Sequence, residues 1–272
     1  MASIKLAVGA SLGAAAVVGG GYLTYDQLLK GNELILLERL NGTELVPKYG
    51  EASSFASKYK KYLVDPENSK NKWWWDLSFK RLKEDIKVED KKSKLNSIFY
   101  VANEEKIKSA FGSEATALSQ VCWEAIKADA VGWDSQENKE ANVWTYCSIL
   151  SSKPKFISAS DHSDNTKFGG DTKHHNKAAS AKDNEEDNRM FWELREKEFF
   201  GEKGKEGTGH GLSQGSIFAT LYGKKDAKEA NDTVKKTCKT VYATTKPTDS
   251  SSSNVTDEDI KKFCYLVPET TN

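Results

Sequence analysis

The chain has few of the residues on which most catalytic and metal-binding motifs depend. Only four of its 272 residues are histidine and only four are cysteine. No C-x-x-C or Cys-His grouping occurs at the short spacing of a zinc site, and no G-x-S-x-G sequence marks a serine nucleophile. Between Gly201 and Gly215 lie six glycines, but the phosphate-binding pattern G-x-x-x-x-G-K-[ST] is missing there. The sequence therefore predicts no cofactor, no metal ion and no catalytic residue, and it favours a protein that is not an enzyme.

The chain also lacks a net charge, because 40 Lys and Arg residues balance 40 Asp and Glu residues. A nucleic-acid-binding protein normally carries a basic surplus, so nucleic acid is not expected as a partner. Arginine is scarce among the basic residues. With 38% hydrophobic residues and 19 glycines, the composition is that of a folded protein rather than a disordered one.

One uncharged apolar run, Leu6 to Leu23, stands near the N-terminus. As a helix its eighteen residues span about 27 Å, which is just enough for the hydrocarbon core of a bilayer. Three interpretations of residues 1–30 stay open: a transmembrane anchor, a signal peptide cleaved before Tyr22, or a buried helix of a soluble protein. A lipoprotein signal is excluded because the first cysteine is Cys122. The anchor and the signal peptide, which are favoured, both place the body of the protein outside the cytoplasm, and the anchor makes the membrane a partner through residues 6–23.

The rest of the chain contains an internal repeat with an offset of 117 residues. The sequence WDL that begins at Trp75 recurs as WEL at Trp192, and YCSIL recurs as FCYLV. A further pair of cysteines matches at an offset of 116. All the cysteines of the chain fall on this pattern, and they are Cys122, Cys147, Cys238 and Cys264.

The repeat predicts two modules of the same plan, over 31–150 and 189–272. Between them, 151–188 is rich in Ser, Lys, Asp and Asn and is expected to be a polar linker. The expected fold class is mainly α, with an N-terminal transmembrane or signal helix followed by two duplicated small helical modules, each with a disulfide.

Apolar residues at helical spacing support this class. A capping-box-like sequence from Thr256 to Asp259 predicts the start of a last short helix. The stretch Tyr146 to Leu150 also resembles a short buried strand, which stays open as an alternative. The other predicted helices cover 72–87, 114–130, 191–200 and 226–242.

Two equally spaced cysteine pairs behind an export segment favour structural disulfides over free thiols. An ancestral module that folded alone had only its own two thiols to join, and copying preserves that pairing. The sequence therefore predicts Cys122–Cys147 and Cys238–Cys264. Buried free thiols in a reducing compartment remain the alternative.

The repeat also assigns a role to two tryptophans. Because Trp75 has a partner in Trp192, both are predicted core residues, while Trp73 or Trp74 is expected to be partly exposed. The alternative is that the three adjacent indoles form a stacking platform or a membrane-interface belt.

Three of the four histidines lie in the expected linker, close to several aspartates. A metal site is an alternative for them, but a polar linker offers no neighbouring groups that would hold the ligands in a fixed orientation. Solvated side chains are therefore expected for His162, His174 and His175.

These features together resemble the large paralogous membrane and surface protein families of haemotropic mycoplasmas. The resemblance rests on the Gly/Ala-rich N-terminal segment, the Lys-rich and Arg-poor composition, the WWWDL sequence and the repeated Cys-x-aliphatic-aliphatic ending. It implies a protein associated with the cell surface or membrane, from families connected with antigenic variation. It carries over no catalytic residues.

The sequence thus favours a membrane-anchored, extracytoplasmic surface protein that is antigenic or interacts with a host or cell-surface protein. One alternative is a structural membrane scaffold that oligomerises through the small residues of Leu6 to Leu23. A further alternative is an exported hydrolase with a site at the module interface.

Overall fold

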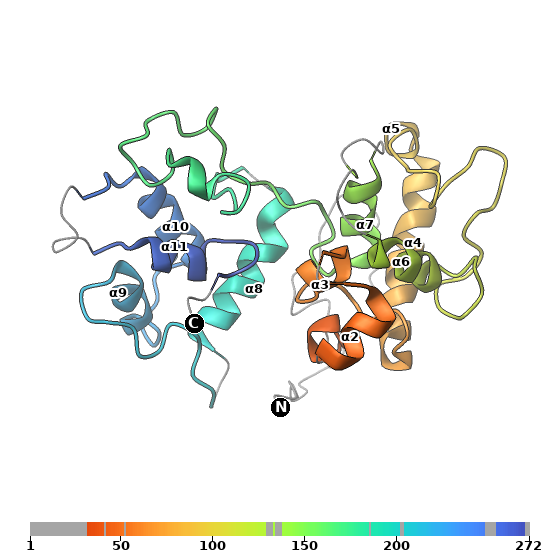
Figure 1. Cartoon of the computed structure of the whole chain (residues 1–272), viewed down its shortest axis with the longest axis horizontal. Helices are drawn as coiled ribbons and strands as arrows, with labels where there is room; N and C mark the ends of the chain where they lie inside the picture. The colour runs from red at the N-terminus through yellow and green to blue at the C-terminus, as the bar shows by residue number, and fades with distance from the viewer. Residues whose placement is uncertain are drawn as a thin grey trace. The chain divides into compact units, whose positions relative to one another are not determined.

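The computed structural model shows a helical protein (Figure 1). The described residues form ten α-helices and no β-strand, which confirms the expected class. Contacts divide the chain into two compact units, with the boundary between Lys153 and Pro154. The expected membrane or signal helix over 6–23 lies outside the described residues. The structure describes residues 32–40, 42–51, 53–128, 133, 138–184, 186–201, 204–247 and 254–269.

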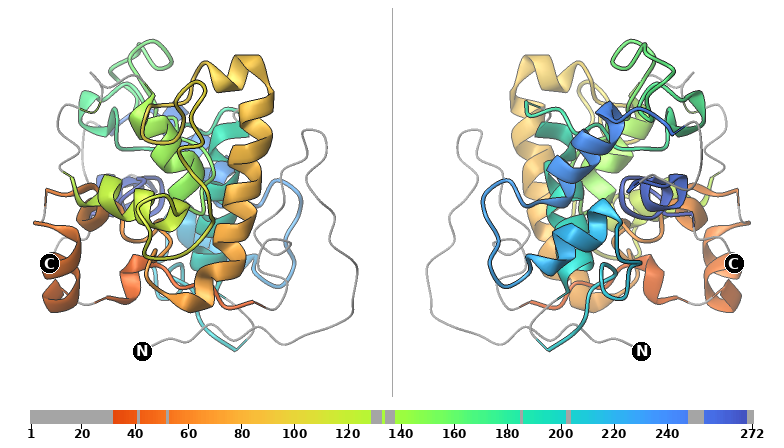
Figure 2. Two further views of the ribbon diagram at one scale, coloured as in Figure 1. Left: turned by 90° about the vertical axis from the view of Figure 1, so that its right-hand side faces the viewer. Right: turned by 90° about the vertical axis from the view of Figure 1, so that its left-hand side faces the viewer.

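The long helix α4 organises the first unit, called unit 1 below. Its residues Trp74, Trp75 and Leu82 are buried, and α4 packs against both α6 and α7, as the left view in Figure 2 shows. Two 3-10 turns, η1 and η2, precede α4. The elements of unit 1 are η1 (Leu37–Arg39), α2 (Gly42–Tyr49), α3 (Phe55–Tyr59), η2 (Ser69–Asn71), α4 (Lys72–Lys87), α5 (Glu89–Lys92), α6 (Leu118–Lys127) and α7 (Lys139–Cys147).

In the second unit, unit 2, α10 lies against α8, α9 and α11. The last helix starts with the predicted capping box: the Thr256 side chain accepts a hydrogen bond from the Asp259 backbone, and the Asp259 side chain accepts one from the Thr256 backbone. The elements of unit 2 are η4 (Thr172–His174), η5 (Glu186–Asn188), α8 (Arg189–Phe200), α9 (Ile217–Gly223), α10 (Val234–Ala243) and α11 (Asp257–Phe263).

The predicted helices hold in outline, and α4 has the predicted bounds. The strand alternative for Tyr146 to Leu150 is wrong, because α7 continues to Cys147. Ser148 after it forms only an isolated bridge with Leu63. The alternation of apolar residues that suggested a strand is instead the buried end of a helix followed by one extended turn.

Each unit is closed by one disulfide. Cys122 of α6 joins Cys147 at the end of α7 with a Cα–Cα distance of 5.6 Å. Cys238 of α10 joins Cys264, which follows α11, with a Cα–Cα distance of 5.9 Å. All four side chains are buried. The pairing predicted from the repeat is therefore confirmed. It joins α6 to the end of α7 in unit 1, and α10 to the residue that follows α11 in unit 2.

The expected linker over 151–188 is not a linker in the structure. From Pro154 onward it belongs to unit 2, where Ile157 and Phe168 are buried. So is the run from Ala178 to Ala181. The physical reason is that small Ala and Ser side chains let this backbone approach the core closely, so that its amides can pair with distant segments. Because the segment contains few aliphatic residues, its composition predicted a linker rather than part of a core.

Asn71 is a buried polar residue that holds the entry to α4. Its Oδ1 accepts a hydrogen bond from Ile35 N at 2.8 Å, and its Nδ2 donates to Ile35 O at 2.7 Å and to Asp65 O at 2.8 Å. The side chain is 0% exposed. One amide thus satisfies three buried backbone groups from two segments, which fixes both segments against the start of α4.

Asn188 makes the same three bonds at the start of α8. Its Oδ1 accepts from Lys155 N at 2.8 Å, and its Nδ2 donates to Lys155 O at 2.7 Å and to Ser180 O at 2.9 Å. Asn188 is likewise 0% exposed. Asn71 and Asn188 stand 117 residues apart, which is the offset of the repeat.

Backbone pairing also occurs at matching places in the two units. In each unit, the residue after the second cysteine forms a β-bridge with a segment that precedes the long helix. The same segment forms another β-bridge with a residue near the start of the unit. In unit 1 the bridges are Leu63 with Ser148 and Leu36 with Val64; in unit 2 they are Ala178 with Tyr265 and Phe156 with Ala179.

The repeated tryptophans are both buried but bond differently. Trp75 is 0% exposed and Trp192 is 5% exposed. The Trp192 indole donates to Ser180 O at 3.0 Å, whereas Trp75 Nε1 is buried without a hydrogen-bond partner. Trp74 is buried as well, and the half-buried Trp73 donates its indole N–H to Glu33 O.

This difference predicts unequal effects of removing the indole N–H. We expect Trp192→Phe to lower the unfolding free energy of unit 2 by about 1 kcal/mol more than Trp75→Phe lowers that of unit 1, because only Trp192 loses a hydrogen bond. Urea unfolding of the full chain, with hydrogen exchange resolving the two units, measures both losses. A larger loss for Trp75→Phe would contradict the bonding described here.

Candidate functional site

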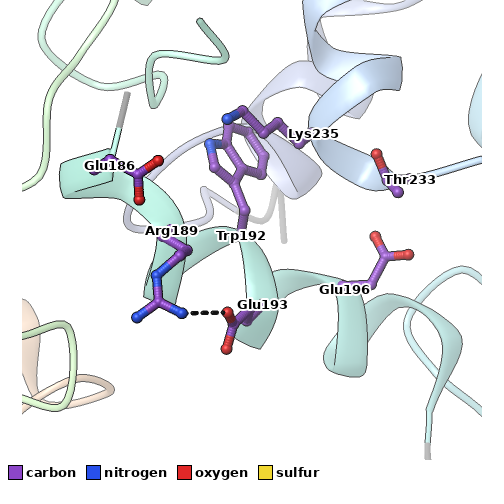
Figure 3. A pocket seen from close by; sticks show the side chains of 7 residues that line it. All are labelled: Glu186, Arg189, Trp192, Glu193, Glu196, Thr233 and Lys235. Carbon is purple, nitrogen blue, oxygen red and sulfur yellow. Dashed lines mark hydrogen bonds and ion pairs between the residues drawn. The ribbon is translucent and has the colours of Figure 1, made fainter. Parts of the chain in front are cut away.

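Unit 2 has a groove lined mainly by charged side chains (Figure 3). Its volume is about 270 Å³, and it opens between α8 and the start of α10. Trp192 provides the apolar part of the lining, and charged side chains surround it. The lining residues are Glu186, Arg189, Trp192, Glu193, Glu196, Thr233 and Lys235.

The charged side chains of the groove are held by local contacts. Arg189 pairs with Glu193 one turn further along α8, at 3.1 Å. Glu196 accepts a hydrogen bond from Val234 N at 2.8 Å and also pairs with Lys228. The helix periodicity that places residues three and four apart on one face therefore brings these acidic side chains to the groove.

The groove combines an aromatic side chain with charged ones. The indole of Trp192 offers an apolar face, and side chains of both charges offer polar contacts around it. None of the seven lining side chains that Figure 3 draws is a histidine or a cysteine. The sequence predicts Trp192 only as a core residue, because the groove depends on α10 lying beside α8.

A second polar centre surrounds His174, which the sequence analysis expected to be solvated. His174 is instead 0% exposed. Its Nδ1 lies 2.9 Å from the Tyr265 hydroxyl and its Nε2 lies 3.1 Å from Asp257 Oδ1. The expectation was wrong because both partners are more than 80 residues away along the chain, so no local sequence pattern predicts the contact.

Burial changes the acid–base properties around His174. Desolvation lowers the pKa of His174 below its usual value, although the neighbouring Asp257 carboxylate acts in the opposite direction. For Asp171, burial pushes the pKa up, but hydrogen bonds from the backbone and ammonium of Lys173 and from Lys246 outweigh it and lower the pKa to about 2.

The two other histidines within residues 151–188 also have protein partners. His175 Nε2 lies 3.0 Å from Gly169 O, and the His162 ring packs against Tyr242 with 5.7 Å between centroids. Over the described residues, no group of three or more His, Cys, Asp or Glu side chains is placed to hold a metal ion.

The two disulfides bear on the location of the protein. Disulfides form and persist in oxidising compartments and are rare in a reducing cytosol. One buried disulfide in each unit therefore favours an extracytoplasmic body. Within the residues that the structure covers, no helix is both long and apolar enough to cross a membrane.

Comparison with known proteins returns no match. The chain fits no protein-family model, and neither a curated protein nor a solved structure is significantly similar to it.

Proposed function

We propose that the chain is an extracytoplasmic surface protein, anchored to a membrane by residues 6–23, that acts by binding rather than by catalysis. The observation that carries the proposal is the pair of buried disulfides, one closing each unit. The uncharged run at the N-terminus supports the anchor. The mixed-charge groove around Trp192 supports a binding role, with a host or cell-surface protein as the partner.

The body of the protein consists of two copies of one module in this proposal. Support comes from the asparagines at the starts of α4 and α8, which make the same three hydrogen bonds 117 residues apart. The matching disulfides and isolated bridges add to it. A duplicated, cross-linked body suits a surface protein, because copying a stable scaffold leaves its outer residues free to vary without loss of the core.

Protease accessibility on intact cells tests the location. We expect added trypsin to cleave the full chain, with its many lysines, while a cytoplasmic reference protein stays intact. Deleting residues 6–23 is expected to remove the chain from the membrane fraction. Protection of the full chain on intact cells, with cleavage only after lysis, would contradict the proposed location. N-terminal sequencing of the mature protein distinguishes a retained anchor from a cleaved signal.

A further inference from the structure

The histidines of this chain are distributed unevenly between the two units. Every one of them follows Pro154, and unit 1 contains none. Imidazole is the side chain whose ordinary pKa lies between pH 5 and pH 8. A response to mild acid is therefore concentrated in unit 2. The four residues are His162, His174, His175 and His210.

Three of the four lie on residues 157–181, here called the strap, which packs onto the core of unit 2 by backbone pairing. The strap amide of Ala179 donates to Cys264 O at 2.8 Å, and that of Gly169 donates to Tyr242 O at 3.0 Å. At its end, Ser180 O accepts the indole N–H of Trp192. These contacts connect the strap to the disulfide-bonded segment and to both α8 and α10.

His174 lies at the centre of the docked strap with a partner for each ring nitrogen. As a neutral imidazole it donates from Nε2 to Asp257 and accepts at Nδ1 from the Tyr265 hydroxyl. A proton on Nδ1 turns that nitrogen into a donor, so the Tyr265 hydrogen must turn to its other neighbour, Lys173 O, at 3.2 Å. The hydrogen bonds survive protonation, but the new charge has to be accommodated.

The charges around His174 already balance before it is protonated. Lys173 pairs with Asp257 at 2.6 Å and with Asp171 at 3.1 Å, and Asp171 also pairs with Lys246. Two carboxylates thus face two ammonium groups. Protonation of His174 adds a positive charge to a buried site whose nearest carboxylate is shared with Lys173.

The remaining charges nearby belong to other pairs. Glu258 of α11 pairs with Lys261, and Glu269 pairs with Lys177 of the strap. Among the described residues, Asp257 is the carboxylate that contacts His174 directly, and the charge of Asp171 also favours protonation of the ring.

His162 adds a second imidazole that is partly buried where the strap meets α10. It stacks edge-on against Tyr242, and burial lowers its pKa although Asp161 acts against this. Asp161 pairs with Lys182 at 2.6 Å, which limits what it offers to His162. The nearby His175 and Lys167 disfavour a further positive charge.

From this geometry we infer that the strap is an acid-sensitive latch: protonation of His174, with His162 contributing, weakens the docking of residues 157–181 on unit 2 and leaves unit 1 in place. The direction in which stability changes with pH follows from the linkage between proton binding and folding. Both histidines bind a proton less readily in the folded state than in the unfolded chain. The stability that the two neutral histidines give the folded state is complete above about pH 6.5 and is lost as pH falls below that value. Ionised carboxylates such as Asp171, with a pKa of about 2, continue to stabilise the folded state until the solution is much more acidic.

The Trp192 indole N–H reports the latch directly, because its acceptor Ser180 O belongs to the strap. We expect its ¹⁵N–¹H resonance in the full chain to disappear at a lower urea concentration at pH 5.0 than at pH 7.4. The other six tryptophans all precede Lys153, so their resonances give an internal reference that shifts less. His174→Gln is expected to remove most of the pH-dependent shift, whereas His210→Gln, at an exposed position, leaves it unchanged.

Two results would overturn the latch. One is an equal pH shift in the urea midpoint for Trp192 and the tryptophans of unit 1. The other comes from the unaltered protein and does not require any variant to fold: histidine ring ¹⁵N shifts, followed against pH, should show His174 titrating at a lower pH in the folded protein than in the urea-unfolded chain. If His174 titrates at the same pH in both states, or at a higher pH in the folded protein, burial does not oppose its protonation and the latch is wrong.

Discussion

Replacing Cys238 and Cys264 together by Ala is expected to lower the unfolding free energy of unit 2 by about 3 kcal/mol. The two cysteines stand 26 residues apart. Opening a loop of this length returns roughly that much conformational free energy to the unfolded chain. Because both side chains are buried, removing the sulfur atoms adds a packing loss in the same direction. Urea unfolding of the full chain, resolved by hydrogen exchange, measures the effect in each unit.

The matched variant removes Cys122 and Cys147, whose separation of 25 residues is nearly the same. It should destabilise unit 1 by a similar amount and leave unit 2 within error of the parent. Each double variant is the control for the other, because the unit whose disulfide one variant removes keeps its disulfide in the other variant. A loss confined to unit 2 in both variants would contradict the division of the chain at Lys153.

Asn188→Ala is expected to lower the stability of unit 2 by about 3 kcal/mol, an effect as large as that of the disulfide. The substitution removes three hydrogen bonds, one of them donated by the backbone N–H of Lys155 and two accepted by the carbonyls of Lys155 and Ser180. Each lost hydrogen bond costs about 0.5–1.5 kcal/mol, so the three together cost about 3 kcal/mol. The same measurement applies, and Asn165→Ala, at an exposed position, is the control.

Asn71→Ala extends the comparison to unit 1. If the two asparagines occupy equivalent places in a duplicated module, Asn71→Ala should destabilise unit 1 by a similar amount. A cost below about 1 kcal/mol would place Asn71 within the range of an ordinary surface substitution. That result would contradict the equivalence of the two sites.

Regular local patterns predicted the helical parts of the fold well. The bounds of α4 follow from apolar residues at helical spacing, and the start of α11 follows from the Thr256 and Asp259 capping box. The disulfides followed from a comparison of the chain with itself. Each of these features is encoded within one segment or in the spacing of rare residues.

The strap could not be predicted in the same way, because its contacts are non-local. Ala179 pairs with Cys264 and His174 pairs with Asp257 only once the helices are packed. Its small and polar residues carry no helical or strand period, so composition alone suggested a linker. The charged groove beside Trp192 likewise depends on the packing of α10 against α8.

The asparagines are a different case, since a clue to them was present in the sequence. Asn71 and Asn188 are aligned by the same 117-residue offset that aligns Trp75 with Trp192. Aromatic residues and cysteines stand out as repeated core positions, whereas asparagine is usually exposed, so its type alone does not predict burial. Their role became evident from the backbone groups that they bind.

The state of the cysteines inside living cells tests the extracytoplasmic assignment most directly. Cells that make the full chain are quenched in acid, free thiols are blocked with N-ethylmaleimide, and the peptides are mapped without reduction. We predict two linked peptide pairs, Cys122 with Cys147 and Cys238 with Cys264, and no blocked thiol at these positions. Recovery of the four cysteines as blocked thiols would contradict the assignment, because it would show that the protein resides in a reducing compartment.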